Sequence, residues 1–271
     1  MVRCTAGRAG RSQPVLLRRD DAGEGRSAYT SPRPPSAAVV VRRSGIDLNY
    51  TLQFGVVYRQ LPYLLGGAVI TLELAFIIFW GGALIGLFGA MGKTFGGPRT
   101  RRLVNVYVAF FTNTPAFVQV YFLFNGLPDA GILLSPFSAA VIGLTVNSGA
   151  YLTEIQRAGF VSVRRTELDA AEALGMNLLQ SVRYVILPHI MRTIYPPLAN
   201  FFIWILLGTS MAALIGVEEL TGRAVNISAS TLRSIEVFIV VAGIYIGLTL
   251  IATAALYALG RIFFRVKMRV L

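Results

Sequence analysis

Polar side chains lie inside several long apolar segments of this sequence, where they are the groups best suited to binding chemistry. Most are amides and hydroxyls, and two are carboxylates: Glu73, Thr112, Asn113, Thr114, Gln119, Asn147, Ser148, Glu154, Thr209 and Ser210. Amide and hydroxyl groups can bind an ammonium and a carboxylate reversibly. Polar groups inside a membrane are costly and usually face a cavity or a neighbouring helix. The set is therefore a candidate pathway for a small polar solute, with hydrogen bonding between helices as the alternative for each residue.

Two positions in these segments carry a further expectation. Pro115 follows Thr114 and has no N–H, so it frees a backbone carbonyl that a polar cavity or a neighbouring side chain must satisfy. Glu73 is the one charged residue in its segment. A carboxylate in the pathway would favour a cationic solute, and a structural hydrogen bond is the alternative role.

The apolar segments offer no constellation for catalysis. They contain no pair of acids, no cluster of metal ligands and no nucleophile beside a base. Gly92-Lys93-Thr94 resembles the end of a phosphate-binding loop, but Leu87 stands where that pattern needs its first glycine, so we interpret it as a basic helix end. His189, the only histidine, is expected to pack in a loop. We therefore predict no catalytic residue, metal or bound cofactor for this chain.

The composition predicts an all-α membrane protein. The chain is 55% hydrophobic and only 14% charged, whereas soluble domains are about a quarter charged. Five apolar runs each reach the roughly 20 residues that a helix needs to cross a bilayer. These runs are Leu61–Met91, Leu103–Asn125, Ile132–Thr153, Ile194–Val217 and Val237–Leu259. We expect five transmembrane helices.

Lysine and arginine predict how these helices are oriented. The segments after the first, third and fifth runs are basic, and the loop 126–131 after the second run has no basic residue. Basic loops stay in the cytoplasm, so the N-terminal side is outside and the C-terminal side is inside. The net charge of +12 is then mainly a topology signal, and no nucleic-acid partner is expected. Glu218 and Glu219 fall at the outer face, where we expect them to be solvated, with contact to an external protein as the alternative.

The N-terminal residues 1–45 do not fit this orientation. Residues 1–43 contain nine arginines and three acids, scattered among glycine, serine and proline. One interpretation is a disordered extension. The other, which we favour slightly, is a start site assigned too early, with a valine at positions 39–41 as the initiator. Residues 46–60 are predicted to form a short amphipathic lead-in at the outer interface.

A cytoplasmic segment of unusual regularity, residues 157–192, separates the third and fourth runs. Alanine, leucine and glutamate favour a helix over residues 166–174, and Gly175 is a helix stop. A second helix follows with apolar residues near helical spacing, and Pro188 is expected to end it. The sequence therefore predicts a helical hairpin with a glycine turn and a proline stop.

This hairpin resembles the EAA loop of ABC importer permeases. That motif reads Glu-Ala-Ala, three residues, Gly, nine residues, Ile, one residue and Leu-Pro. The corresponding residues are Asp169, Ala170, Ala171, Gly175, Val185, Leu187 and Pro188. Aspartate for glutamate and valine for isoleucine are mild departures from it. The resemblance implies that the first short helix is a coupling helix, which sits in a cleft of an ATPase subunit.

Other stretches between residues 60 and 265 resemble the polar amino acid permeases, the group of the histidine, glutamine and glutamate permeases. The resemblance is carried by residues 112–119, 135–142, 147–155, 208–211 and 215–221. Thr112 and Asn113 stand where relatives more often have Arg-Gly. Leu207 and Gly208 stand where many have a lysine and an aspartate, so any pairing made by those charges is missing here.

The resemblance implies a permease domain over residues 61–265 that works in a bacterial inner membrane. It implies two ATPase subunits, a second permease copy or related permease, and an external substrate-binding protein as partners. ATP and Mg would bind the ATPases and not this chain, and the cargo would be a polar amino acid. Two alternatives stay open: a secondary transporter or channel without ATPase partners, and an ABC permease for another small solute.

Overall fold

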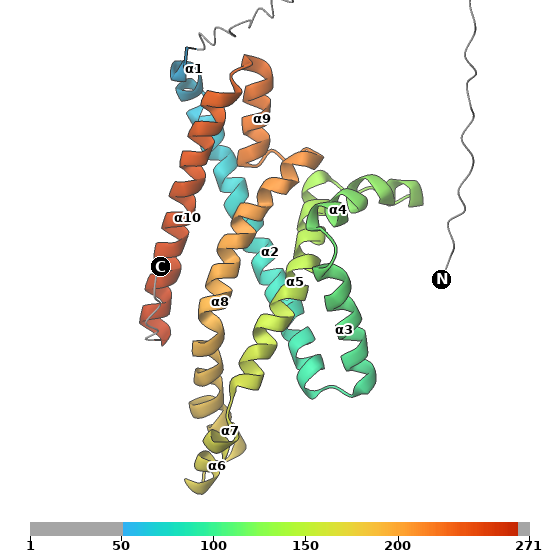
Figure 1. The fold of residues 1–271 in the computed structure, drawn as a ribbon, viewed down its shortest axis with the longest axis vertical. Helices are drawn as coiled ribbons and strands as arrows, with labels where there is room; N and C mark the ends of the chain where they lie inside the picture. Colours follow the sequence, from blue (N-terminus) through green and yellow to red (C-terminus); the bar gives the residue numbers. More distant parts are fainter. Residues whose placement is uncertain (1–50, 265–271) are drawn as a thin grey trace, which may run out of the picture. The chain divides into compact units, whose positions relative to one another are not determined.

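The chain folds into a set of helices, and a computed structural model describes residues 51–264 (Figure 1). No strand occurs within that range. The predicted N-terminal extension lies outside the described residues, and so does the first part of the predicted lead-in. The α-helices are α1 (Phe54–Arg59), α2 (Leu61–Phe95), α3 (Pro98–Thr112), α4 (Ala116–Tyr121), α5 (Pro136–Ser162), α6 (Arg165–Ala173), α7 (Leu178–Ser181), α8 (Leu187–Gly208), α9 (Leu220–Thr231) and α10 (Ser234–Phe264).

The five predicted apolar runs lie mainly in α2, the α3–α4 pair, α5, α8 and α10. Three helical stretches are long and apolar enough to cross a membrane, namely α2, residues 178–215 and α10, and α3 with residues 116–130 makes a fourth if the bent pair is one span. That pair is bent by 97°, so the second run is not one straight helix. α5 is less apolar because its buried positions include Asn147, Ser148, Thr153 and Gln156.

The centre of the fold is the close pairing of α2 with α5 (Figure 1). Gly82 and Gly86 of α2 meet Ser148, Leu152 and Thr153 of α5, and a Cβ added at Gly86 would lie 2.8 Å from the Leu152 backbone. Small residues let two helix backbones approach closely in a membrane. Leucine and isoleucine side chains from α2, α5 and α8 extend this contact into a buried apolar core.

The hairpin between α5 and α8 differs from the prediction at Pro188. The second helix does not end there, because α7, a π-helical turn at Val182–Ile186 and α8 follow one another without a break. The Leu187 N–H bonds to the Val182 carbonyl, five residues back, so the turn widens just before the proline. Proline is tolerated at the start of a helical segment, and Pro188 is the second residue of α8. The predicted proline stop is therefore wrong.

Candidate functional site

A bend between α3 and α4 brings several of the predicted pathway residues together. Pro115 has no N–H, so the Phe111 carbonyl four residues earlier loses its helical partner. Gln119 Nε2 donates to that carbonyl at 3.1 Å, and Asn147 Nδ2 of α5 donates to it at 2.9 Å. Asn147 also donates to Gln119 Oε1 at 3.2 Å. The expectation that neighbouring side chains satisfy the freed carbonyl is confirmed, and both amides are buried.

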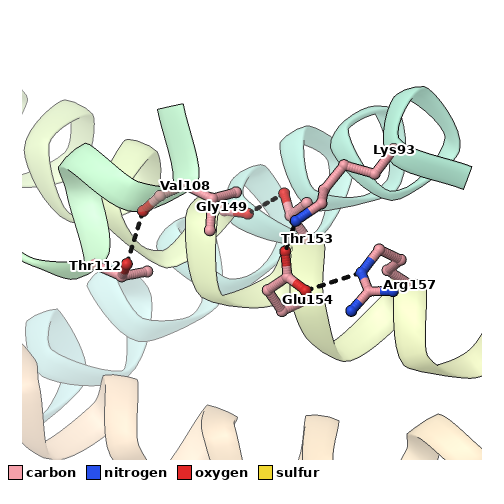
Figure 2. Close-up of polar contacts among 7 residues, drawn as sticks. All are labelled: Lys93, Val108, Thr112, Gly149, Thr153, Glu154 and Arg157. Carbon is pink, nitrogen blue, oxygen red and sulfur yellow. Dashed lines mark hydrogen bonds and ion pairs between the residues drawn. The ribbon is translucent and has the colours of Figure 1, made fainter. Parts of the chain in front are cut away.

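The other polar residues of the bend bond to the last turn of α3. Thr112, Asn113 and Thr114 each donate from their side chain to the carbonyl four residues earlier, at 2.7 Å. Figure 2 shows the first of these bonds, from Thr112 to Val108. Tyr151 of α5 donates to the Thr112 carbonyl at 3.3 Å. In this conformation these groups hold the end of α3 in place.

A small cavity lies beside the bend, between α4, α5 and α8. Its lining includes Asn147 and Ser148 together with Ala116, Trp204 and Gly208. It leaves only about 10 Å³ for the centre of a water molecule, which is room for one water at most. The described conformation is therefore closed around these polar groups.

Thr209 and Ser210 follow α8 directly, in a tighter 3-10 helical segment that ends at Ile215. Thr209 donates to the Leu206 carbonyl and Ser210 to the Leu207 carbonyl, each at 2.8 Å. Thr209 is fully buried and Ser210 is half-buried. Both residues bond within their own segment and are not in the lining of the cavity, although Gly208 and Met211 on either side of them are.

The two predicted carboxylates lie outside this polar cluster. Glu154 of α5 forms an ion pair with Lys93 at 2.5 Å, which joins the end of α2 to α5, and a second one with Arg157 at 2.9 Å within α5 (Figure 2). Glu73 is exposed on α2 and makes no hydrogen bond or ion pair with any residue between 51 and 264. The sequence placed both carboxylates in the same candidate pathway as the amides and hydroxyls, whereas in the structure both lie away from the cluster at the α3–α4 bend.

A further carboxylate, Glu219, lies inside the fold. It is fully buried and accepts hydrogen bonds from Thr71 Oγ1 at 3.0 Å, the Tyr245 hydroxyl at 2.9 Å and the Gly222 N–H at 3.0 Å. The expectation that Glu219 is solvated is wrong, while Glu218 is exposed as expected. Two features of the sequence could have indicated this burial. Glu219 directly precedes α9, where a side chain can cap the helix, and the first and fifth apolar runs each contain a hydroxyl that can donate to it, Thr71 and Tyr245.

The α6–α7 hairpin lies at the end of the described fold opposite α9 (Figure 1). α6 ends at Ala173, and Gly175 has a φ of 71°, the left-handed conformation that glycine adopts without strain. The Gly175 N–H bonds to Glu172 O at 2.8 Å and the Met176 N–H to Ala171 O at 3.0 Å, which closes the turn. The predicted glycine stop is confirmed.

The hairpin presents an apolar surface to its surroundings. Leu174, Leu178 and Leu179 are 76%, 80% and 77% exposed. Of the predicted coupling residues, Asp169, Ala170, Gly175 and Leu187 are exposed, Val185 and Pro188 are half-buried, and Ala171 is buried. Glu167 Oε2 lies 3.3 Å from His189 Nδ1, so the base of the hairpin connects α6 to α8. Three exposed leucines around one tight turn form an apolar patch, and such patches occur where a protein contacts another protein or a membrane.

Comparison with known proteins gives a consistent family. The family model described as "Binding-protein-dependent transport system inner membrane component" matches residues 82–265. Glutamine transport system permease protein GlnP of Escherichia coli (strain K12) is 36% identical over 210 residues, covering 77% of this chain and 96% of GlnP. Probable amino-acid ABC transporter permease protein PatM of Vibrio harveyi is 36% identical over 215 residues, covering 77% and 92%.

A solved structure agrees with the sequence relatives. The "Crystal structure of an amino acid ABC transporter with histidines" superposes with a TM-score of 0.72 at 34% identity, covering 78% of this chain and 99% of that one. The family match, the two permeases and this structure all belong to binding-protein-dependent or ABC transport systems. The chain therefore belongs to the binding-protein-dependent transport system inner membrane components, and is a membrane-embedded permease, the transport subunit of an ABC importer.

Proposed function

We propose that this permease carries polar amino acids across a bacterial inner membrane by alternating access. The relatives named for glutamine and for amino acids support this cargo. In this proposal the chain crosses the membrane five times, with its N-terminal side outside and the α6–α7 hairpin inside. ATP and Mg bind two partner ATPases, a second permease completes the pore, and an external binding protein delivers the amino acid.

The exposed hairpin is the observation that carries the proposal. Its three leucines face away from the rest of the chain, and a partner ATPase would cover them. A movement made at a distant nucleotide site reaches the pathway only through a stiff element that contacts both. Such an element is present, because the unbroken helix that starts at Leu178 in the hairpin reaches Gly208 at the cavity.

The pathway in this proposal opens between α4, α5 and α8. Separating these helices would uncover Asn147 and Ser148 in the closed cavity and bring Gln119 and the hydroxyls of the bend into contact with the solute. Amide and hydroxyl groups suit a zwitterionic amino acid, because they interact with both charges without holding either tightly. ATPase closure turns the pathway outward, and hydrolysis returns it inward.

Uptake into proteoliposomes tests the proposal. The chain is reconstituted with its ATPase and binding protein, and labelled amino acids are supplied with and without ATP. Gly175→Asp places a side chain at a φ of 71° in the hairpin, and Gly131→Asp is the matched control at a φ of 80° elsewhere. We expect uptake to need every partner and to be lost only in Gly175→Asp, with the complex still assembled. Uptake by the isolated chain without ATP, unchanged by Gly175→Asp, would instead establish a secondary transporter.

A further inference from the structure

A hollow of about 550 Å³ lies along one face of α3. Its lining residues recur at intervals of three and four, so they share one side of the helix: Pro98, Arg101, Arg102, Asn105, Val106 and Ala109. Helix α3 packs on α2 and α5 (Figure 1). All six lining residues are exposed, so this face is open within the chain.

The hollow has a positive charge that the chain itself does not neutralise. Neither Arg101 nor Arg102 is within ion-pair distance of a carboxylate in residues 51–264. Arg101 Nη2 donates to the Thr94 carbonyl at 3.0 Å, which fixes its guanidinium next to the end of α2. Arg101 lies in the first turn of α3, where the helix dipole disfavours a cation, and Arg102 follows it directly. An anion bound in the hollow would neutralise a positive charge that no carboxylate of residues 51–264 pairs with.

The apolar character of α3 increases along the helix away from these arginines. Asn105 is one turn further on, followed by Val106 and Ala109, and the neighbouring Phe110 is 60% exposed. A charged end, an amide and then an apolar stripe follow one another on the same face. A soluble anion would use only the charged end, whereas an amphiphile would use the whole length.

We propose that this hollow binds one anionic phospholipid. The Arg101 and Arg102 guanidiniums donate hydrogen bonds to the head-group phosphate, and the Asn105 amide donates to the ester region. An acyl chain lies along Val106 and Ala109. Arginine is suited to this role because its planar group donates two parallel hydrogen bonds to a phosphate.

Native mass spectrometry of the purified full chain, titrated with dioleoyl-phosphatidylglycerol or dioleoyl-phosphatidylcholine, tests the site. We expect one tightly bound phosphatidylglycerol and a binding constant roughly 30-fold weaker in the double variant Arg101→Gln/Arg102→Gln. Arg99→Gln is the matched control, because Arg99 is exposed on the same helix but does not line the hollow. Thermal unfolding of the three proteins should coincide.

Four results would overturn the proposal. An equal loss in Arg99→Gln would mean diffuse charge attraction, and equal binding of phosphatidylcholine would mean that no anion is recognised. Full displacement of the lipid by inorganic phosphate would mean a soluble-anion site. In the assembled importer, loss of the ATPase from the double variant with lipid binding unchanged would mean that an acidic surface of the ATPase occupies the hollow. Because lipid binding is read on the chain alone, a failure of the transport proposal would leave this test unaffected.

Discussion

Most polar residues at the α3–α4 bend act first on the backbone. Asn147 and Gln119 supply the donors that Pro115 removes, and Thr112 to Thr114 bond to the end of α3. A buried carbonyl without a donor is costly, so these residues have a structural role whatever they bind during transport. The substrate pathway would then be built from side chains that also hold the bend.

Replacing Asn147 tests this structural role. Asn147→Leu removes one of the two donors to the Phe111 carbonyl and the donor to the buried Gln119 Oε1, so we expect a loss of about 1–3 kcal/mol in the free energy of unfolding. The exposed Asn113, which bonds only within its own helix turn, is the matched amide, and Asn113→Leu should change stability little. Thermal unfolding in detergent measures both. Unchanged stability together with lost uptake would assign Asn147 to the solute alone.

The buried Glu219 gives a second prediction at this scale. Glu219→Ala leaves the buried Gly222 N–H without its acceptor and removes one partner each from the Thr71 and Tyr245 hydroxyls, which keep Gly67 O and Thr221 Oγ1, so we expect a loss of about 1–3 kcal/mol. Glu218→Ala changes the exposed neighbour and should cost no more than about 0.5 kcal/mol. Hydrogen exchange over α9 and thermal unfolding report the difference. Similar behaviour of the two variants would contradict a role for the buried network in holding α9.

The pairing of α2 with α5 sets the geometry of the helices. The two backbones come close at Gly82 and Gly86, which have no side chain, and a larger residue at either position would not fit against α5. An ion pair from Lys93 of α2 to Glu154 of α5 then joins the two helices towards the ends that are expected to be cytoplasmic (Figure 2). This pair is the element against which the bent α3–α4 unit and α8 pack.

A leucine at Gly86 should separate the two helices. Its Cβ alone would lie 2.8 Å from the Leu152 backbone, so we expect a loss of about 1–3 kcal/mol and less folded protein. Gly243→Leu is the matched control, because Gly243 lies in α10 with nothing within 4 Å of an added Cβ. Folded yield by gel filtration and the midpoint of thermal unfolding measure the effect. Equal loss in both variants would mean that helix flexibility, and not the close contact, is what the glycines provide.

The sequence predicted which segments are helical better than how they join. Apolar runs and the Gly175 turn depend on local chemistry, and the structure has both. The 97° bend at Pro115 depends on donors from Gln119 and from a different helix, which no local pattern contains. The continuation through Pro188 depends on a widened turn just before it. Glu219 was misplaced because its three donors come from α2, α9 and α10.

The described residues 51–264 combine an exposed apolar hairpin at one end of a long helix with a closed polar cavity further along α8. One continuous helix links the exposed leucines of the hairpin to the cavity lining. Glu167 and His189 connect α6 to that helix, so a push on the hairpin would move α8 with it. In the proposed mechanism, a movement of the partner would therefore reach α8 both along its own helix and through the Glu167–His189 contact.

Charges on the hairpin should block partner binding and leave the chain folded. Leu178→Glu/Leu179→Glu changes side chains that are 80% and 77% exposed, so chain stability should hold while affinity for the ATPase falls more than roughly tenfold. Leu133→Glu is the control, because Leu133 is 83% exposed in the loop before α5. Co-purification of the ATPase measures the effect. Normal ATPase binding by the double variant would refute the docking surface.

The widened turn at Val182–Ile186 has a consequence for the direction in which the hairpin points. Each residue of an α-helix rotates the chain by about 100°, so one additional residue in a turn changes the angular phase between the two ends of the helix. The number of residues in this turn therefore sets the angle, around the helix axis, between the leucines of α7 and the face of α8 that lines the cavity. Inserting or deleting one residue between Asn177 and Pro188 would therefore turn the exposed leucines of α7 about the helix axis relative to α8, whereas a substitution there would leave their direction unchanged.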